Sequence, residues 1–152
     1  MTQYWLMKSE PDVYSIDDLE AQGVTAWEGI RNYQARNFMR DDMKIGDKVL
    51  FYHSNAKPPG IAGLAEVCKL AYPDYFAFDP KSKYYDPKTT KDNPRWMMVD
   101  VKFVKKFKQL LPLNEIKENE NLQNMMVIRK GSRLSIQKVS KEDYDYIVTN
   151  FA

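Results

Sequence analysis

Cysteine, histidine and long apolar runs are scarce in the sequence, and each shortage excludes a class of protein. Cys68 is the only cysteine, so no disulfide forms within the chain and a reducing compartment is expected. One histidine and one cysteine cannot supply a zinc site, and Asp12, Asp17 and Asp18 lack the spacing of a calcium loop. No segment reaches the roughly 18 apolar residues of a membrane span, and the first residues do not resemble a signal peptide. We expect no metal, no other cofactor, no membrane contact and no secretion, hence a protein of the cytoplasm, or of the nucleus in a eukaryote.

An excess of charge of one sign is missing too. The 23 basic and 21 acidic residues leave a formal net charge of +2. We therefore do not expect an extended basic surface that binds many phosphates of a nucleic acid. Contacts with a few phosphates are compatible with this charge balance. Glycine is also scarce, and the stretch from Gly60 to Gly63 is too short to cradle a phosphate and precedes no helical pattern.

Apolar and aromatic residues, by contrast, are plentiful. They make up 43% and 13% of the 152 residues, which is typical of a globular protein. A chain of this length buries a substantial core without cross-links. We predict a single α+β domain over residues 1–152, and a monomer.

The hydrophobic periodicity predicts five strands and four helices. Alternation places the strands at 4–9, 48–53, 60–67, 96–103 and 133–139. Helical spacing and N-cap residues place the helices at 16–22, from 33 to about 43, at 110–117 and from 141 onward, with Ser15, Asn32 and Ser140 as caps. Gly63 indicates a bulge or a close backbone approach. This spacing of strands fits a small barrel.

Residues 71–95 contain four prolines and six aromatic rings without helical or strand periodicity. So long an irregular segment in a compact domain is functional or disordered, and its rings favour packing. We predict an ordered flap. A protein-interaction module that uses this flap is one alternative function, because tyrosine-rich loops anchor interfaces.

The stretch WEGIRNYQARNFMR, residues 27–40, combines a helix with an unusual preceding loop. Ala35, Phe38 and Met39 form the helix's apolar stripe, whereas Trp27 and Arg31 precede the cap. Such a loop offers an aromatic plane and hydrogen-bonding groups beside a helix N-terminus, where negative charge is favoured. The loop, more than the helix, suggests a binding site.

Catalysis is a further alternative, because His53 and Cys68 fall on or just after two strands that are expected to be neighbours. A Cys–His nucleophile needs a lowered thiol pKa and an orienting third group, and the sequence indicates neither. A structural cysteine and a hydrogen-bonded histidine fit better, since free cysteine is among the most buried residue types. We therefore predict no catalytic residues.

Recognition of a base is the hypothesis that uses most of the remaining side chains. Rings are usually core residues, but together they offer surfaces for stacking, which contributes roughly 1 to 3 kcal/mol per base. Candidates for stacking are Trp5, Trp27, Trp96, Tyr52 and the flap tyrosines. Candidates for phosphate contact are Arg31, Arg36, Arg40, Arg129 and Arg133. Candidates for reading a base edge are Ser9, Asn32, His53, Ser54, Ser135 and Gln137.

Eight short motifs follow one another in an order that resembles the EVE-domain family over essentially the whole chain. They are YWLMKSEP, W-x-G-I-R-N-Y-Q-A-R-N-F, G-D-K-V-L-F-Y-H-S-N, P-P-G-I-A-G, A-Y-P-D, Y-Y-D-P-K, R-W-x-M-V-D-V and R-L-S-I-Q. The resemblance implies a PUA-like fold, a curved and mostly antiparallel β-barrel flanked by short helices, akin to ASCH and YTH domains. It also implies a non-catalytic module that binds DNA or RNA and recognises a modified base, chiefly a modified cytosine.

Carried over residue by residue, the resemblance implies pocket positions at Ser9, Trp27, Asn32, His53 and Ser54, with an extension to Arg133, Ser135 and Gln137. Together with Arg31 and Tyr52 from the residue-based argument, these ten form the predicted nucleotide site. Arg36 and Arg40 are the predicted phosphate contacts.

Overall fold

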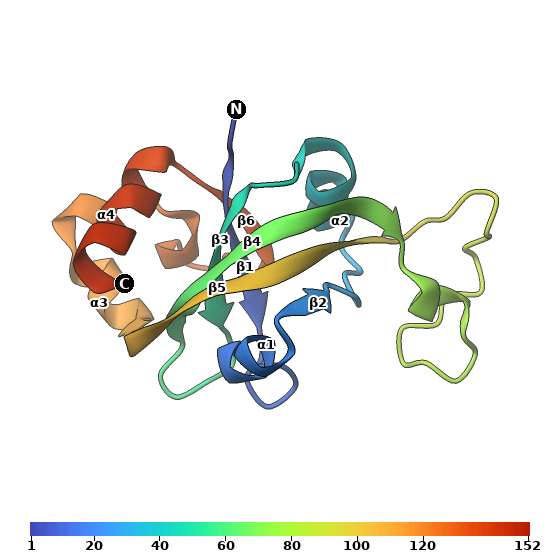
Figure 1. Ribbon diagram of the computed structural model, residues 1–152, viewed down its shortest axis with the longest axis horizontal. Coiled ribbons are helices and arrows are strands. Elements are labelled where there is room, and N and C mark those ends of the chain that lie inside the picture. Colours follow the sequence, from blue (N-terminus) through green and yellow to red (C-terminus); the bar gives the residue numbers. More distant parts are fainter.

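The computed structural model describes residues 1–152, and its centre is one curved six-stranded sheet in the order β2-β5-β4-β3-β1-β6 (Figure 1). The pairing of β1 with β3 is parallel and the other four pairings are antiparallel. The strands are β1 (Tyr4–Ser9), β2 (Val24–Ala26), β3 (Lys48–His53), β4 (Gly60–Pro73), β5 (Met97–Pro112) and β6 (Ile136–Val139). This confirms the predicted α+β class and the curved, mostly antiparallel architecture.

Alternation along β1 and β3 distributes apolar side chains to both faces of the sheet. Trp5 and Phe51 belong to one hydrophobic cluster, while Leu6, Leu50 and Tyr52 belong to a second cluster on the other face. Both strands are therefore buried on two sides, as their nearly continuous apolar sequences predict.

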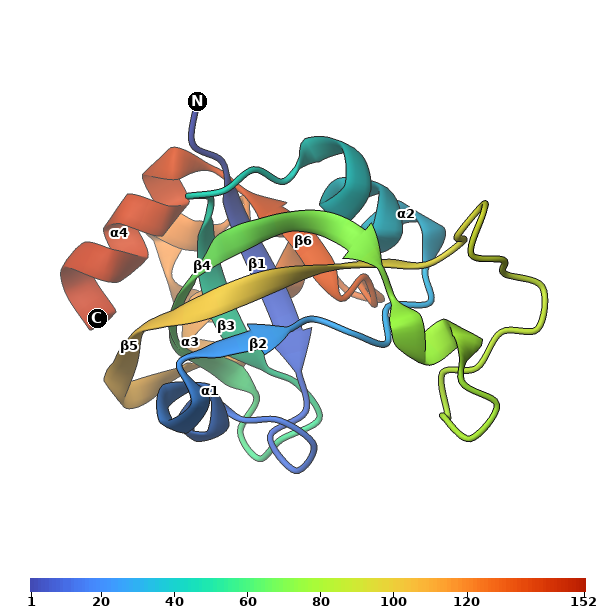
Figure 2. The same cartoon turned by 45° about the vertical axis from the view of Figure 1, so that its right-hand side comes forward.

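Four α-helices cover these two faces (Figure 2). They are α1 (Ile16–Gln22), α2 (Tyr33–Asn37), α3 (Leu113–Glu118) and α4 (Lys141–Phe151), and a π-helical turn, η1 (Phe38–Asp42), extends α2. Residues of α1, α2 and η1 pack in the first cluster, whereas residues of α3 and α4 pack in the second. Short 3-10 helices add η2 (Tyr75–Phe78), η3 (Glu120–Leu122) and η4 (Met126–Ile128). No helix has the length and apolar character needed to cross a membrane.

The predicted N-caps are confirmed. Ser15 Oγ accepts from Asp18 N at 3.1 Å, and the Asp18 carboxylate accepts from Ser15 N at 2.9 Å, which completes a capping box. The side-chain oxygen of Asn32 accepts from Ala35 N at 3.0 Å, so this short polar residue both ends the preceding loop and begins α2.

The long β4–β5 ribbon owes its curvature to repeated shifts of register, the first of them next to Gly63. A Cβ atom at Gly63 would lie 2.4 Å from Lys105 O and 2.8 Å from the side chain of Ile16. The glycine therefore permits α1 and β5 to approach the strand closely, as its position in the sequence predicts.

Four predicted elements differ from the structure. The strands predicted at 60–67 and 96–103 continue to Pro73 and Pro112 as β4 and β5, so β4 includes the start of the predicted flap. The helix predicted at 110–117 begins only at Leu113, because Leu110 packs against the first cluster and Leu111 against the second, and this alternation continues β5. The strand predicted at 133–139 begins at Ile136. Gln137 Nε2 donates to Leu134 O at 2.9 Å and to Ser132 Oγ at 3.1 Å, which holds residues 132–135 in a turn.

Candidate nucleic-acid interface

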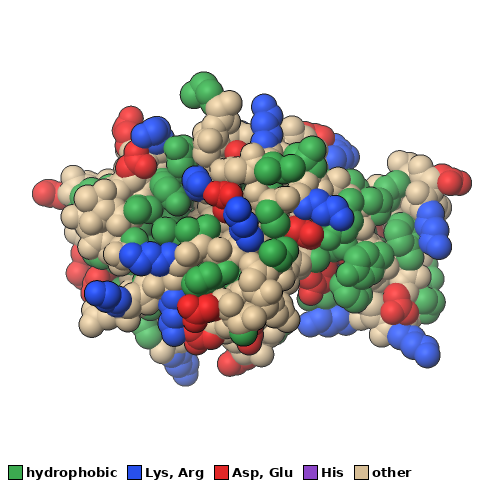
Figure 3. Space-filling view, in the orientation of Figure 1, with side chains coloured by type: hydrophobic (Ala, Val, Ile, Leu, Met, Phe, Trp, Pro, Cys, Tyr) green, Lys and Arg blue, Asp and Glu red, His purple; other side chains and the backbone are tan.

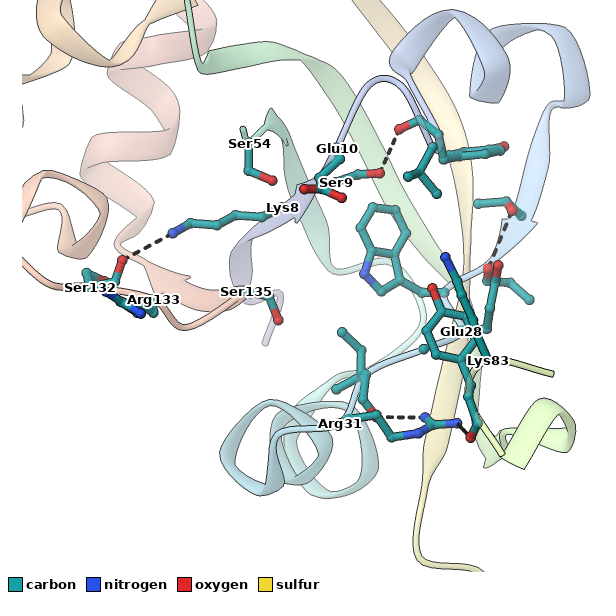
Figure 4. A pocket seen from close by; sticks show the side chains of 18 residues that line it. Lys8, Ser9, Glu10, Glu28, Arg31, Ser54, Lys83, Ser132, Arg133 and Ser135 are labelled. Carbon is teal, nitrogen blue, oxygen red and sulfur yellow. Dashed lines mark hydrogen bonds between the residues drawn. The ribbon is translucent and has the colours of Figure 1, made fainter. Parts of the chain in front are cut away.

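A cavity of about 530 Å³ opens beside the ends of β1 and β2 (Figure 4). Its walls come from these strand ends, the loop after β2, the flap and the segment before β6. This volume lies within the usual range of ligand sites. The lining residues are Lys8, Ser9, Glu10, Val13, Tyr14, Thr25, Ala26, Trp27, Glu28, Gly29, Ile30, Arg31, Ser54, Lys83, Tyr84, Ser132, Arg133 and Ser135.

Trp27 forms the floor of the cavity and carries a free donor. Its backbone N–H donates to Val99 O at 2.8 Å, and its ring meets Phe51 edge to face at 5.5 Å between centroids. The indole N–H of Trp27 makes no hydrogen bond, whereas Nε1 of Trp5 donates to Asp47 and Nε1 of Trp96 donates to Asp86. No fully buried side-chain nitrogen or oxygen lacks a partner. The free N–H therefore reaches solvent, although the residue is only 7% exposed.

Ser9 and Ser54 lie together at another edge of the cavity, where β1 and β3 end. Ser54 N donates to Ser9 O at 3.0 Å, which continues the parallel pairing of the strands. Ser9 Oγ donates its proton to Tyr14 O at 2.6 Å. The Ser9 hydroxyl consequently has lone pairs left to accept a hydrogen bond but no second proton to donate.

The flap is docked onto the loop after β2 through a buried carboxylate. Asp74, with a fully buried side chain, accepts from Arg31 Nη1 at 3.1 Å and from Gly29 N at 2.9 Å. Arg31 Nη2 donates to Tyr84 O at 2.7 Å. These contacts place Lys83 and Tyr84 on the cavity wall, so Arg31 acts by positioning the flap.

A ladder of alternating cations and rings extends outward from this junction. The Arg31 guanidinium lies 5.3 Å from both the Tyr84 and Trp96 ring centroids. Tyr33 stacks on Trp96 at 5.0 Å, and the Arg36 guanidinium covers Tyr33 at 4.7 Å. Each contact at such distances contributes a modest attraction. The ladder joins the flap to α2.

Glu28 adds a carboxylate at the mouth of the cavity. The residue as a whole is exposed, yet partial burial of the carboxyl group raises its pKa, against a hydrogen bond to its own backbone N–H. The Asp74 carboxylate adds to the rise and Lys83 opposes it. No cation lies within salt-bridge distance of Glu28.

Six of the ten predicted nucleotide-site residues line this cavity. The residue-based argument or the family resemblance singled out each of them: Ser9, Trp27, Arg31, Ser54, Arg133 and Ser135. Sequence reasoning did not single out Lys8, Glu28 and Lys83. Lys8 ends an otherwise apolar strand face, which was a usable signal, whereas Glu28 and Lys83 look like ordinary surface charges in the sequence.

The other four residues lie outside the cavity, and their side chains are engaged elsewhere. Tyr52 is packed in the second hydrophobic cluster, where burial raises its pKa to about 12. His53 Nε2 accepts from Ile16 N at 3.1 Å at the start of α1, and burial lowers its pKa. The side chain of Asn32 caps α2, and Gln137 is buried with the two hydrogen bonds that shape the preceding turn.

The two predicted phosphate contacts lie on α2 and η1. Arg36 donates from Nη1 to Arg95 O at 3.0 Å, and from Nε and Nη2 to the side-chain oxygen of Asn37. Each nitrogen of its guanidinium group therefore already makes a hydrogen bond within the protein. Arg40 forms an exposed pair with Asp41 at 2.8 Å, which offsets its charge locally. Neither lines the cavity.

Cys68 and His53 are too far apart to act together. His53 is paired with Gly60 at one end of the β3–β4 ladder. Cys68 lies eight residues further along β4, roughly 25 Å away at about 3.3 Å per residue. Burial raises the pKa of the Cys68 thiol, which disfavours the nucleophilic thiolate. No group of three or more His, Cys, Asp or Glu side chains is arranged to hold a metal ion.

The curved sheet, with a polar and aromatic cavity at its strand ends, defines a PUA-like domain with a candidate binding site. The EVE domain model matches residues 3–150, and the chain belongs to the EVE domain family. Human thymocyte nuclear protein 1 is 44% identical over 168 aligned residues, which cover 98% of this chain and 74% of the human protein.

Solved structures agree with this assignment. A hypothetical protein from Leishmania major has a TM-score of 0.92 and 54% identity, with 98% of this chain and 94% of that chain covered. The human THYN1 protein in complex with 5-methylcytosine containing DNA has a TM-score of 0.90 and 46% identity, covering 97% and 96%. An ASCH protein from Zymomonas mobilis, covering 99% of each chain, has a TM-score of 0.55 at 8% identity, which shows a shared fold alone.

Proposed function

We propose that this protein is a non-catalytic reader of modified nucleic acid, which takes a modified cytosine, turned out of DNA, into the cavity beside Trp27. The observation that carries the proposal is the free indole N–H of Trp27 inside a cavity of about 530 Å³ with polar walls. The human relative in complex with 5-methylcytosine containing DNA supports the choice of ligand, since the two chains share 46% identity along nearly their whole length.

The hydrogen-bonding groups of the cavity complement the edge of cytosine. Its amino group requires an acceptor, which Ser9 Oγ or the Glu28 carboxylate supplies. Its ring nitrogen and carbonyl oxygen require donors, and the Trp27 N–H is free to donate. Trp27 is only 7% exposed, and the rings of Tyr14 and Tyr84, which also line the cavity, are further candidates for stacking.

Recognition of one methyl group requires more than its burial. Burying a methyl group contributes about 0.8 kcal/mol, which is roughly a fourfold preference. Extrusion of a base from a duplex costs a few kcal/mol. A useful reader must therefore reject competing bases through unmade hydrogen bonds, which the fixed donor and acceptor pattern of the cavity would provide.

Two alternatives are less well supported. An interaction module based on the flap would use exposed rings, and Tyr75 and Tyr85 are indeed 55% and 43% exposed. Figure 3 shows hydrophobic side chains gathered over the flap, with basic and acidic side chains interspersed on the same face of the molecule. The flap nevertheless lies against a concave polar cavity, which an interaction module does not need. An enzyme that uses Cys68 is disfavoured because His53 lies at the other end of the ladder and burial raises the pKa of the thiol.

The cellular location stays a prediction. The vertebrate relatives carry the word nuclear in their name, which supports a nuclear location where the host cell has a nucleus. The choice of DNA over RNA follows the human relative in the same way.

Fluorescence anisotropy titrations test the proposal. Duplex and single-stranded oligonucleotides, in DNA and RNA forms, would carry one central cytosine, 5-methylcytosine or 5-hydroxymethylcytosine at a fixed, stated salt concentration. We expect tighter binding of a modified strand. Trp27→Phe keeps most of the ring packing but removes the N–H, and should lower affinity roughly tenfold, in line with the loss of one buried hydrogen bond.

Tyr75→Phe is the matched control, because this exposed ring lies outside the cavity. Equal affinity of the wild type for every base, or an unchanged affinity after Trp27→Phe, would show that the cavity does not read the base.

A further inference from the structure

Lys8 is an incompletely solvated cation without a counterion. It is the last residue but one of β1 and pairs with Tyr52, with Nζ 5.8 Å from the Tyr52 ring centroid, and burial lowers its pKa. The only hydrogen bond of Nζ is a long one of 3.5 Å to Ser132 O. Lys48 and Lys106, by contrast, each reach a carboxylate within 4.0 Å, and every other lysine without such a partner is exposed. Removing a cation from water without a partner is unfavourable, so the site has unused capacity for an anion.

Three more residues with donors, Ser132, Arg133 and Ser135, line the cavity together with Lys8. Arg133 makes no side-chain hydrogen bond or ion pair, and neither does the hydroxyl of Ser135. Ser132 Oγ accepts from Gln137 Nε2 at 3.1 Å, which leaves its own proton free. Figure 4 shows Lys8 reaching toward Ser132 and Arg133, with Glu28 and Lys83 on the far side of the cavity.

Carboxylates do not neutralise this wall. Glu10, an acidic residue that also lines the cavity, accepts from Asn55 Nδ2 at 2.9 Å and lies near Ser9. Two cations and two hydroxyl donors line this part of the cavity, and no carboxylate lies within 4.0 Å of either cation. This combination matches the needs of a phosphate group, whose oxygens accept several charge-assisted hydrogen bonds.

The position of this wall relative to Trp27 suggests which phosphate it would meet. A nucleotide that enters the cavity brings its sugar and both flanking phosphates with it. With the base edge at Trp27 and Ser9, the backbone must leave along a different wall. The wall around Lys8 carries two cations without an ion-pair partner, whereas on the far side the one cation, Lys83, is accompanied by Glu28.

We propose that Lys8, Ser132, Arg133 and Ser135 form a phosphate subsite, which binds one of the two phosphates flanking the recognised base. This inference rests on the proposed function, because it assumes that a nucleotide occupies the cavity. It goes further in assigning a backbone contact to the interior of the cavity around Lys8. Of its four residues, only Arg133 was a candidate for phosphate contact in the sequence, which placed the predicted contacts themselves on Arg36 and Arg40.

The experiment combines a charge deletion in the protein with a charge deletion in the DNA. Oligonucleotides with one 5-methylcytosine would carry a neutral methylphosphonate at the phosphate on its 5′ side, on its 3′ side, or at a distant position. Wild type and Lys8→Met are titrated with each. For the wild type, one flanking methylphosphonate should weaken binding roughly tenfold, as expected for a hydrogen bond to a charged group.

Lys8→Met should weaken binding of unmodified-backbone DNA by a similar factor and should be insensitive to that same methylphosphonate. Its plot of log affinity against log salt should be shallower by about one. Lys117→Met is the matched control, since this exposed lysine lies on α3 outside the cavity. A thermal melt confirms that each variant is folded.

Equal additional losses in wild type and Lys8→Met at both flanking positions would overturn the subsite while leaving base recognition intact. Failure of the wild type to distinguish 5-methylcytosine from cytosine, with an all-phosphate backbone, would instead overturn the proposed function and the subsite with it.

Discussion

Substitution of Asp74 by asparagine is the sharpest test of how the cavity is assembled. The carboxylate is fully buried and accepts from Arg31, from Gly29 N and, at 3.0 Å, from Phe76 N. Asparagine preserves the shape but removes the charge and leaves one oxygen where two accepted. Arg31 keeps 24% exposure, so water recovers part of the loss.

Breaking a buried ion pair costs about 3 to 5 kcal/mol, and the partial exposure of Arg31 reduces this to roughly 2 to 3 kcal/mol for Asp74→Asn. For a domain of this size, the melting temperature should fall by roughly 5 to 10 °C. Scanning calorimetry measures this change. Hydrogen exchange should show faster opening of the flap than of the central sheet, because the lost contacts join the flap to the loop after β2.

Affinity for modified DNA should fall together with the docking of the flap, since Lys83 and Tyr84 would leave the cavity wall. Asp79→Asn is the matched control, because the Asp79 carboxylate is exposed and accepts only from Lys81 N nearby. An unchanged melting temperature and unchanged affinity for Asp74→Asn would refute the idea that this carboxylate holds the site together.

Two further predictions concern Gly29 and His53. In Gly29→Ala, the new Cβ would lie 2.5 Å from the Tyr84 ring at a φ of +84°, so affinity and melting temperature should both fall. Gly131→Ala is the control, because Gly131 has a similar φ of +78° but no neighbour within 4 Å. This variant should lower stability by about 1 kcal/mol and leave affinity unchanged. His53 accepts the hydrogen bond from Ile16 N only when its imidazole is neutral. Burial lowers the pKa of His53 in the folded protein, so the unfolded state binds the proton more tightly. The contribution of this bond to folding stability is therefore fully present above the ordinary pKa of 6.5 and is lost as the pH falls below it. Urea titrations between pH 5 and pH 8 should show this decline in wild type but not in His53→Gln, and a decline of equal size in the variant would contradict the assignment.

The fold was predictable where the information is local. N-caps such as Ser15 act within a few residues, and alternation along β1 reports both faces of the sheet, so these elements follow from the sequence. The helix expected at 110–117 is partly wrong because Leu110 and Leu111 are compatible with a helix or with a strand buried on both sides. Only the pairing of Leu111 with Ile61 across the ribbon decides between them.

The candidate site was predictable to the extent that its residues looked out of place in their own elements. Trp27 stood out because it precedes a helix cap and lies off the apolar stripe. Glu28 did not, because its relevance depends on the flap, which packs against the loop from more than forty residues away. His53 looked like a site residue in the sequence, yet its position in space gives it a backbone N–H of α1 as partner.

Whether a given cation has a carboxylate partner says more than the net charge about where the candidate nucleic-acid interface lies. The chain is nearly neutral, and an acidic residue accompanies some of the cations, as Asp41 accompanies Arg40 and Glu66 accompanies Lys48. Lys8 and Arg133 line the cavity without such partners, and Lys8 is partly buried, so reduced solvation makes its interaction with an anion stronger than at the surface. A nearly neutral protein can therefore bind one nucleotide of a polyanion tightly while making few contacts to the rest of the strand, and its affinity for DNA should fall less steeply with salt than that of a protein with a long basic surface.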